Sequence, residues 1–221
     1  MNRRSATKVA PPRPAPRLRA RIRETTEQAI LAAAEEVFAD AGLHAAHMGT
    51  IAARAGVSVG TLYNHFEDRE ALLAGLLLAR HQELVGRLDA GLRDAAGRPL
   101  RERLRAILGA FAGHCEAHRK FMNIVVQREV GRYQQTYPQA WAKKTDAMRD
   151  VHERIEGEMR QGVKERALRP EAADLATTFF LGMMRALIIR DMGTPGGDMA
   201  RDHERLLDAF FGGMGVEGKS A

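Results

Sequence analysis

The chain has neither the cysteine pairs that cross-link a secreted domain nor an apolar segment long enough to anchor a domain in a membrane. Only Cys115 is a cysteine among 221 residues, so an intrachain disulfide is impossible and a cystine-stapled fold is excluded. No apolar stretch approaches the roughly 20 residues that cross a bilayer. The basic N-terminus also lacks the apolar segment of a secretory signal. We therefore expect a cytoplasmic protein with no membrane partner.

Motifs of catalysis are missing as well. The sequence has no cluster with metal-ligand spacing, no nucleophile motif and no glycine-rich phosphate loop, and the glycines of 193–197 match no such loop. An alternating strand pattern of useful length and an internal repeat are also absent. An enzyme would need a pocket that no motif indicates, so we expect neither catalysis nor a cofactor.

Charge is distributed unevenly along the chain. Residues 1–23 contain eight Arg and Lys and no acidic residue, whereas residues 24–80 contain eight acidic residues and three Arg. A basic block beside a folded segment is typical either of a polyanion partner or of a solvated tail. The four prolines of residues 11–16 predict an extended arm up to about Arg17.

After the arm, apolar residues recur every three or four positions, which predicts helix after helix and an all-α fold. Thr25 with Gln28 indicates a capping box that opens the first helix, and Gly42 ends it. Asp198 is placed to cap the last helix. The other helical segments are expected at about 48–55, 58–66, 68–95, 104–111, 121–125, 138–163, 170–192 and 198–212.

The most informative segment, residues 50–66, contains two short helices joined by a tight turn. Ala52 is small where the second helix crosses close beside the first, and Gly56 supplies the positive φ that the turn needs. Ser58 can cap the helix that follows. The apolar side that locks the two helices together consists of Ile51, Ala55, Val57, Leu62 and Phe66.

The other side chains of this segment point largely outward and suit DNA. In a helix-turn-helix the second helix enters the major groove by its N-terminal end. Gly60 allows close approach, Asn64 has the groups to read an adenine edge, and Val59 can pack on a thymine methyl. Donors to phosphate oxygens are offered by Thr61, Tyr63 and His65. The alternative is a helical hairpin that merely folds, with these residues as a solvated face.

A resemblance to the DNA-binding domain of the TetR family of repressors lies in the run Gly60-Thr61-Leu62-Tyr63-Asn64-His65-Phe66, followed by Arg69-Glu70-Ala71-Leu72. It extends back through Ala33, Val37, Phe38, Ala39 and Gly42 and covers roughly residues 24–80. The resemblance implies a homodimer, an operator with pseudo-palindromic half-sites and a ligand pocket in the C-terminal helices. It also implies phosphate contacts from Tyr63, His65 and Arg69.

Three positions depart from the family pattern. His47 stands where a Thr or Ser cap is common, Gly49 where a basic or polar residue is common, and Thr50 where an acid is common. A missing cap costs a helix about 1 kcal/mol. Contacts to DNA from Thr50, Arg54 and Ser58 are nevertheless expected.

These patterns divide the chain into a disordered basic arm (1–22), a DNA-binding domain (23–80), a helical ligand-binding and dimerisation domain (81–215) and a flexible tail (216–221). The DNA-binding domain is acidic, so its attraction to DNA has to come from local groups and from the arm. We expect residues 3–23 to follow the DNA backbone or an adjacent minor groove.

The helices of 170–192 and 198–212 fit the dimerising pair that the resemblance implies, and they would form a four-helix bundle with the partner's copy. The residues expected to be shared between core and interface are Phe179, Phe180, Met183, Leu206, Phe210 and Phe211. A purely intramolecular core is the alternative for each of them.

Polar or aromatic residues on otherwise apolar faces of 101–192 are the candidates for an effector pocket. They are His114, His118, Phe121, Gln127, Arg128, Trp141, Met148 and Met183. Each also fits the core or a helix contact. His114 and His118 share a helix face and can chelate a metal, but no third ligand is evident and Cys115 lies about 100° round the helix. We therefore expect no metal site.

The sequence predicts a two-state dimer, most simply a repressor that a small molecule releases from its operator. DNA needs the recognition helices about 34–36 Å apart, one helical turn. A ligand among the helices of 101–192 would move the helix of 68–95, which links both domains, and change this spacing. The alternative is a ligand-independent or architectural DNA-binding protein. The sequence is compatible with activation as well as with repression, and it specifies neither the effector nor the operator.

Overall fold

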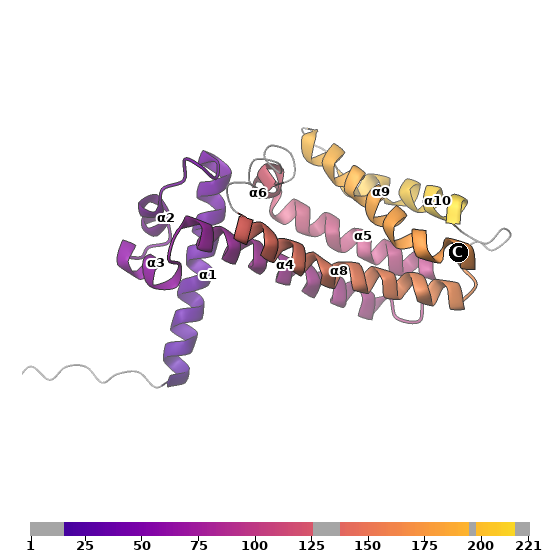
Figure 1. Ribbon diagram of the computed structural model, residues 1–221, viewed down its shortest axis with the longest axis horizontal. Coiled ribbons are helices and arrows are strands. Elements are labelled where there is room, and N and C mark those ends of the chain that lie inside the picture. The colour runs from indigo at the N-terminus through magenta and orange to yellow at the C-terminus, as the bar shows by residue number, and fades with distance from the viewer. Residues whose placement is uncertain (1–15, 126–137, 195–197, 215–221) are drawn as a thin grey trace, which may run out of the picture.

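The computed structural model describes residues 16–125, 138–194 and 198–214, and within these ranges the chain is helical with no β-strand. The expected all-α fold is confirmed. The headpiece lies at one end of the molecule, and a long helix leads from it into the C-terminal helices (Figure 1). The headpiece helices are α1 (Pro16–Ala41), α2 (Met48–Arg54) and α3 (Val59–His65), and the connecting helix is α4 (Arg69–Asp94).

The C-terminal helices form a bundle around α4. Both α5 and α8 pack along α4, and α9 and α10 cover the other side of α5 (Figure 1). None of the described helices combines the length and the apolarity that a membrane span requires. The helices are α5 (Leu100–Ala117), α6 (Arg119–Asn123), α8 (Pro138–Lys164), α9 (Ala173–Gly193) and α10 (His203–Met214), with short 3₁₀ turns at Pro170–Ala172 and Met199–Asp202.

The first helix begins earlier than the sequence pattern predicted. α1 starts at Pro16, and Thr25 is an exposed residue within it, so the capping box and the disordered arm over 16–22 were wrong. Proline fits the first helical turn, where its missing N–H would have no intrahelical partner, and Arg and Leu favour helix. The hydroxyl of Thr26 donates to the carbonyl of Ile22 at 2.8 Å. Residues 1–15 of the expected arm lie outside the described residues.

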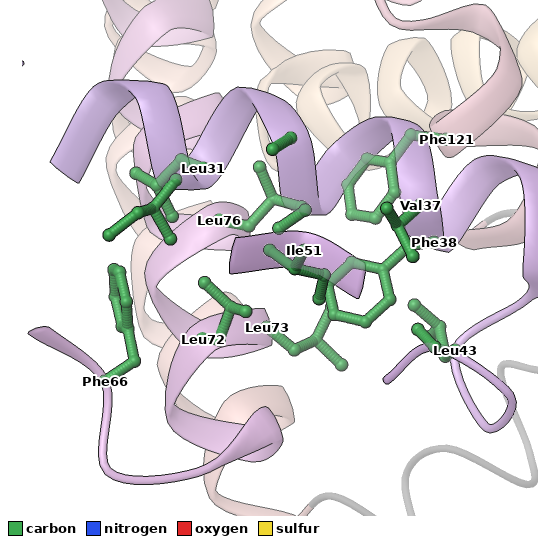
Figure 2. Close-up of a cluster of buried hydrophobic side chains, with 14 of the residues drawn as sticks. Leu31, Val37, Phe38, Leu43, Ile51, Phe66, Leu72, Leu73, Leu76 and Phe121 are labelled. Carbon is green, nitrogen blue, oxygen red and sulfur yellow. The ribbon is translucent and has the colours of Figure 1, made fainter. Parts of the chain in front are cut away.

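The headpiece core draws on both halves of the chain. Phe38 of α1, Ile51 of α2 and Leu76 of α4 are fully buried together. Phe121 of α6 belongs to the same cluster and lies beside Val37 and Phe38 (Figure 2). The headpiece therefore does not close its core alone, and α6 is the element that completes it.

A second core fills the space between the C-terminal helices and is braced by one buried cation. Arg103 of α5 is 6% exposed. Its guanidinium binds Glu158 at 2.6 Å and Glu165 at 3.0 Å, and it also donates to the carbonyl of Arg98. These contacts fasten α5 to the C-terminal half of α8 and to the segment that follows it.

Candidate DNA-binding face and effector domain

The helix-turn-helix is built by short-range signals. α2 ends at Arg54, and Gly56 adopts φ +69°, a left-handed conformation that glycine takes at little cost. The N–H of Val57 then donates to the carbonyl of Ala52 at 3.0 Å, which closes the turn. Ile51 and Leu62 are fully buried between the two helices. The expected turn is confirmed, as is the absence of a side-chain cap from His47.

The N-terminus of α3 is fixed by the predicted cap. Ser58 Oγ accepts a hydrogen bond from the N–H of Thr61 at 3.0 Å, and the two hydroxyl oxygens lie 2.8 Å apart. Both hydroxyls are thus partly engaged with each other. Either retains a lone pair or a proton for a phosphate oxygen, so the cap holds the helix and leaves polar groups at its exposed end.

The outward face of α3 presents four residues that the cores do not use. Val59 is 46% exposed and Tyr63 49% exposed, and Asn64 and Gly60 are exposed as well. A Cβ at Gly60 would meet only Ser58 Oγ, at 3.8 Å, which is ordinary contact. Packing within the chain therefore does not require glycine here, although glycine weakens a helix. A partner molecule that approaches α3 closely at this position would explain why residue 60 is glycine.

Both cationic residues predicted to contact DNA bind groups of the headpiece itself. Arg54 lies 3.1 Å from Asp40 and 3.6 Å from Glu36, so acids of α1 neutralise it. Arg69 donates to the carbonyl of His44 at 2.5 Å and so fastens the start of α4 to the loop before α2. The contacts of Arg54 and Arg69 to phosphate stay a prediction. Each guanidinium would have to bind a phosphate oxygen while it keeps its bonds within the headpiece.

His65 and Thr50 occupy contrasting positions. The side chain of His65 is only 8% exposed, and its Nδ1 is buried 3.8 Å from Glu27 Oε2 without a hydrogen-bond partner in the described part of the chain. Thr50 is exposed in the first turn of α2. Burial of its side chain therefore leaves His65 poorly accessible for the predicted phosphate contact.

The start of α1 carries a basic stripe. Residues 17–23 are all exposed and contain Arg17, Arg19, Arg21 and Arg23. In Figure 1 this part of α1 extends well beyond α2 and α3. The described part of the predicted basic arm is thus a helix, which spaces its charges along a rod.

One exposed stripe of α9 is apolar. Leu175 is 62% exposed, Phe179 42% and Ile189 43%, and they share a face with Gly182 and Ala186. The sequence analysis missed Leu175 and Ile189 because α9 is apolar on all sides, and such a helix has no periodic signal that separates core from interface. A monomer seldom exposes such a stripe, so this face is suited to a partner.

The predicted interface set is otherwise corrected by the structure. Phe180 and Phe210 are 0% exposed and Leu206 is 7% exposed, so these three side chains are core residues of the protomer and were wrong as interface residues. The ring of Phe180 meets that of Phe210 edge-on at 5.4 Å. Phe211 is half-buried beneath the guanidinium of Arg101, 5.9 Å from its ring. Met183 is half-buried as well, so Phe179 alone of the six expected residues is exposed.

The candidate effector residues do not gather around one pocket. Phe121 is in the headpiece core, Met183 is packed against the second core, and Met148 is 37% exposed. Gln127 and Arg128 lie outside the described residues, as does the side chain of Trp141. A groove of about 500 Å³ between α4 and α5 is lined by charged residues such as Arg87, Asp94 and Glu102 and by none of the candidates.

Two of these candidates, His114 and His118, do come together, at the junction of the two domains. Their ring centroids are 4.9 Å apart. His118 Nδ1 lies 2.7 Å from Glu35 of α1, and its Nε2 lies 2.9 Å from Glu83 of α4. Arg80 bridges the same two carboxylates at 2.6 and 3.2 Å. Sequence reasoning missed both glutamates because they are far from His118 along the chain.

His114 lies deeper than His118. It is 3% exposed, and its Nδ1 has no hydrogen-bond partner among the described residues. Burial, together with the charge of His118, lowers the pKa of His114 to about 4, so its imidazole is neutral at physiological pH.

The headpiece sequence is shared with known regulators. Residues 30–76 match the family described as "Bacterial regulatory proteins, tetR family". The HTH-type transcriptional activator FasR of Mycolicibacterium smegmatis is 44% identical over 82 residues, which are 37% of this chain and 36% of FasR. The HTH-type transcriptional regulator UidR of Escherichia coli is 38% identical over 64 residues, 29% of this chain and 33% of UidR. The matches thus span about a third of the length of these curated relatives.

The fold of the whole described chain is shared more widely. The complex of SmeT with triclosan has a TM-score of 0.72 and 23% identity, covering 87% of this chain and 93% of that one. SmeT is the repressor of the Stenotrophomonas maltophilia multidrug efflux pump SmeDEF. FadR from Bacillus subtilis in complex with stearoyl-CoA has a TM-score of 0.70 and 19% identity, covering 83% and 96%. These likenesses show the two-part helical fold.

Proposed function

We propose that the chain is a dimeric cytoplasmic regulator of the TetR family that binds operator DNA and is released from it by a small molecule. The observation that carries this proposal is the outward face of α3. Its residues 59, 60, 63 and 64 are exposed and contribute to neither core. Residues that the fold does not use, on the helix that enters the major groove in this motif, are expected to read DNA.

Each residue of this face has a role that its chemistry supports. Asn64 can pair with the N6 and N7 groups of an adenine, and Val59 can pack on a thymine methyl. The hydroxyls of Tyr63, Thr61 and Thr50 are donors for phosphate oxygens. The basic stripe at the start of α1 adds sequence-independent attraction, which the acidic remainder of the headpiece lacks.

Dimerisation is proposed through the apolar face of α9. This face exposes three large apolar residues, Leu175, Phe179 and Ile189, to water in the monomer. In a two-fold symmetric dimer the same face of each protomer would pack against its copy and bury them. Gly182 and Ala186 between them let two helices approach closely. A dimer would present two α3 helices to successive turns of the major groove.

The response to a ligand would run through α6. Phe121 completes the headpiece core although it follows α5, so any movement of α6 changes the packing of α1. SmeT and FadR were solved in complex with triclosan and with stearoyl-CoA, which supports a small-molecule effector with an apolar part for this chain. By linkage, the effector must weaken DNA binding by the factor by which DNA weakens effector binding.

A regulator without a small-molecule effector is the second candidate, and one observation favours it. Charged residues such as Arg87, Asp94 and Glu102 line the groove between α4 and α5, and none of the candidate effector residues lines it. Thermal unfolding with long-chain acyl-CoA and with triclosan separates the two. A rise in Tm that is coupled to weaker operator binding supports the effector, and unchanged Tm and affinity support the second candidate.

DNA recognition and dimerisation are tested with variants of the two faces. Asn64→Ala should lower affinity for a selected operator about tenfold or more while leaving non-specific DNA binding unchanged, because it removes a base contact worth about 1–3 kcal/mol. Phe179→Glu should give a monomer by sedimentation and lose operator binding with the headpiece fold intact. The matched control is Leu78→Glu, an exposed apolar residue of α4 outside both faces. Operator binding that survives Asn64→Ala and Phe179→Glu would contradict the proposal.

A further inference from the structure

The cluster at the domain junction has the composition of a metal site. His114 lies in the last turn of α5, His118 is the residue that ends α5, and Glu83 comes from α4. One ligand atom from each of the three lies within 4.8 Å of the other two. We propose that Glu83, His114 and His118 bind a divalent cation of the zinc class. The sequence analysis expected no metal site because no third ligand was evident beside these two histidines, and the fold supplies that ligand, Glu83, from α4.

The distances allow the site to close by side-chain movement alone. Zinc binds histidine nitrogen and carboxylate oxygen at about 2.0–2.2 Å, so neighbouring ligand atoms of a tetrahedral site lie about 3.4 Å apart. His118 Nε2 and Glu83 Oε2 are 2.9 Å apart and have to separate slightly. The remaining separations are at most 4.8 Å, so rotation of the Glu83 and His114 side chains would have to shorten them by up to about 1.4 Å.

The surroundings of both histidines fit a cation. His114 is buried, and its Nδ1 lacks a hydrogen-bond partner among the described residues. A cation bound in the cluster would give this buried imidazole a polar partner that the protein itself does not supply. His118 Nδ1 lies 2.7 Å from Glu35 Oε1, which leaves Nε2 directed at Glu83. A carboxylate that holds the far nitrogen of a histidine is the usual support of a metal-binding imidazole.

The charges around the cluster can be kept paired when a cation enters. Arg87 donates to Glu83 Oε1 at 2.9 Å, and Arg80 donates to Glu35 Oε2 at 2.6 Å. Both bonds leave Glu83 Oε2 as the ligand atom. The cation would replace the proton between His118 and Glu83 and the weaker contact of Arg80 to the same oxygen, at 3.2 Å.

The donor set selects the class of metal. Two imidazoles and one carboxylate suit Zn²⁺, Co²⁺ and Ni²⁺, whereas Mg²⁺ and Ca²⁺ favour ligands that are all oxygen. Three protein ligands leave a coordination position for water. The side chain of Glu83 is 32% exposed and that of His118 is 11% exposed, so the cation would enter from the side of Glu83. This site does not depend on the proposed DNA-binding function.

The test is a titration of the chelator-treated, full-length protein with Co²⁺ and then Zn²⁺. We expect one equivalent of Co²⁺ per protomer with the visible absorption of a low-symmetry nitrogen and oxygen site, displaced by one equivalent of Zn²⁺. His114→Gln and His118→Gln should each weaken binding at least 100-fold. Glu35→Gln should weaken it about 10–100-fold and retain the stoichiometry, because Glu35 supports a ligand and is not one.

His152→Ala is the matched control, since it removes an exposed histidine of α8 outside the cluster and should leave metal affinity unchanged. Circular dichroism tests whether each variant is folded. If the histidine variants do not fold, the metal affinity of Glu35→Gln tests the proposal. Absence of a stoichiometric site in the wild-type protein would overturn the proposal. Equal affinity in the wild type and the folded variants of Glu35, His114 and His118 would do so too, because binding would then occur elsewhere.

Discussion

Replacing Gly60 with alanine should change folding and DNA binding in opposite directions. Gly60 is the second residue of α3, and a Cβ there would touch only Ser58 Oγ, at 3.8 Å. Alanine stabilises a helix by about 0.5–1 kcal/mol relative to glycine, because glycine loses more backbone entropy on folding. With no clash to offset this gain, Gly60→Ala should raise the free energy of unfolding by up to that amount.

On DNA the same methyl group should be unfavourable. Gly60 lies at the N-terminal end of α3, the part of a recognition helix that comes closest to the base edges. A methyl there would hold the helix away from the groove or displace a neighbouring contact. We expect operator affinity to fall at least about tenfold, which corresponds to about 1.4 kcal/mol.

The assay pairs urea unfolding with fluorescence anisotropy of a labelled operator duplex. Gly86→Ala is the matched control, since Gly86 is an exposed glycine of α4 with nothing within 4 Å of an added Cβ. It should raise stability to a similar degree and leave DNA affinity unchanged. The reasoning is refuted if Gly60→Ala binds the operator as tightly as the wild type, or if it destabilises the fold.

Three further predictions concern the framework. Arg103→Ala should lower the free energy of unfolding by about 3 kcal/mol, because it strands two carboxylates that Arg103 pairs; a urea-derived loss below about 1 kcal/mol would contradict the role of this brace. Phe121→Ala should cost about 3–5 kcal/mol and expose amides of α1 to hydrogen exchange, and unchanged protection of α1 would disprove the packing of α6 in the headpiece core. Burial lowers the pKa of His203, so the unfolded chain takes up the proton first and stability should fall as pH drops below about 6.5. In chelator-containing buffer His203→Gln should reduce this fall, and an identical pH profile would refute it.

The headpiece was the part best predicted from sequence, because its signals act over a few residues. Gly56 determines the turn, and Ser58 caps α3, both as predicted. Each of these works within four residues of where it stands. The start of α1 shows the limit of this reasoning, because Thr25 offered a cap while Pro16 already began the helix.

The faces of the C-terminal helices could not be predicted in the same way. Apolar residues occur on every side of α9, so periodicity does not distinguish Phe179, which is exposed, from Phe180, which is fully buried. The neighbours that decide this come from α10, whose Phe210 packs on Phe180. Such a contact depends on how the helices are placed, which local sequence does not specify.

The domain junction depends still more on long-range placement. His118 meets Glu35 and Glu83, which belong to two other helices. In sequence these glutamates have the appearance of solvated helix faces. Only the packing of α1, α4 and the end of α5 brings them together, and the third ligand of the proposed metal site is found in the same way.

The central claim, that a dimer reads operator DNA through α3, is tested most directly by selection from random duplexes. Purified protein is mixed with a random duplex pool at low and moderate salt, and the bound sequences are read. The account predicts a short pseudo-palindrome whose half-sites are centred about one helical turn apart, about 10–10.5 base pairs, recovered at both salt concentrations. Recovery of no motif, with binding lost at moderate salt, would contradict it and would assign the affinity to the basic N-terminal residues alone.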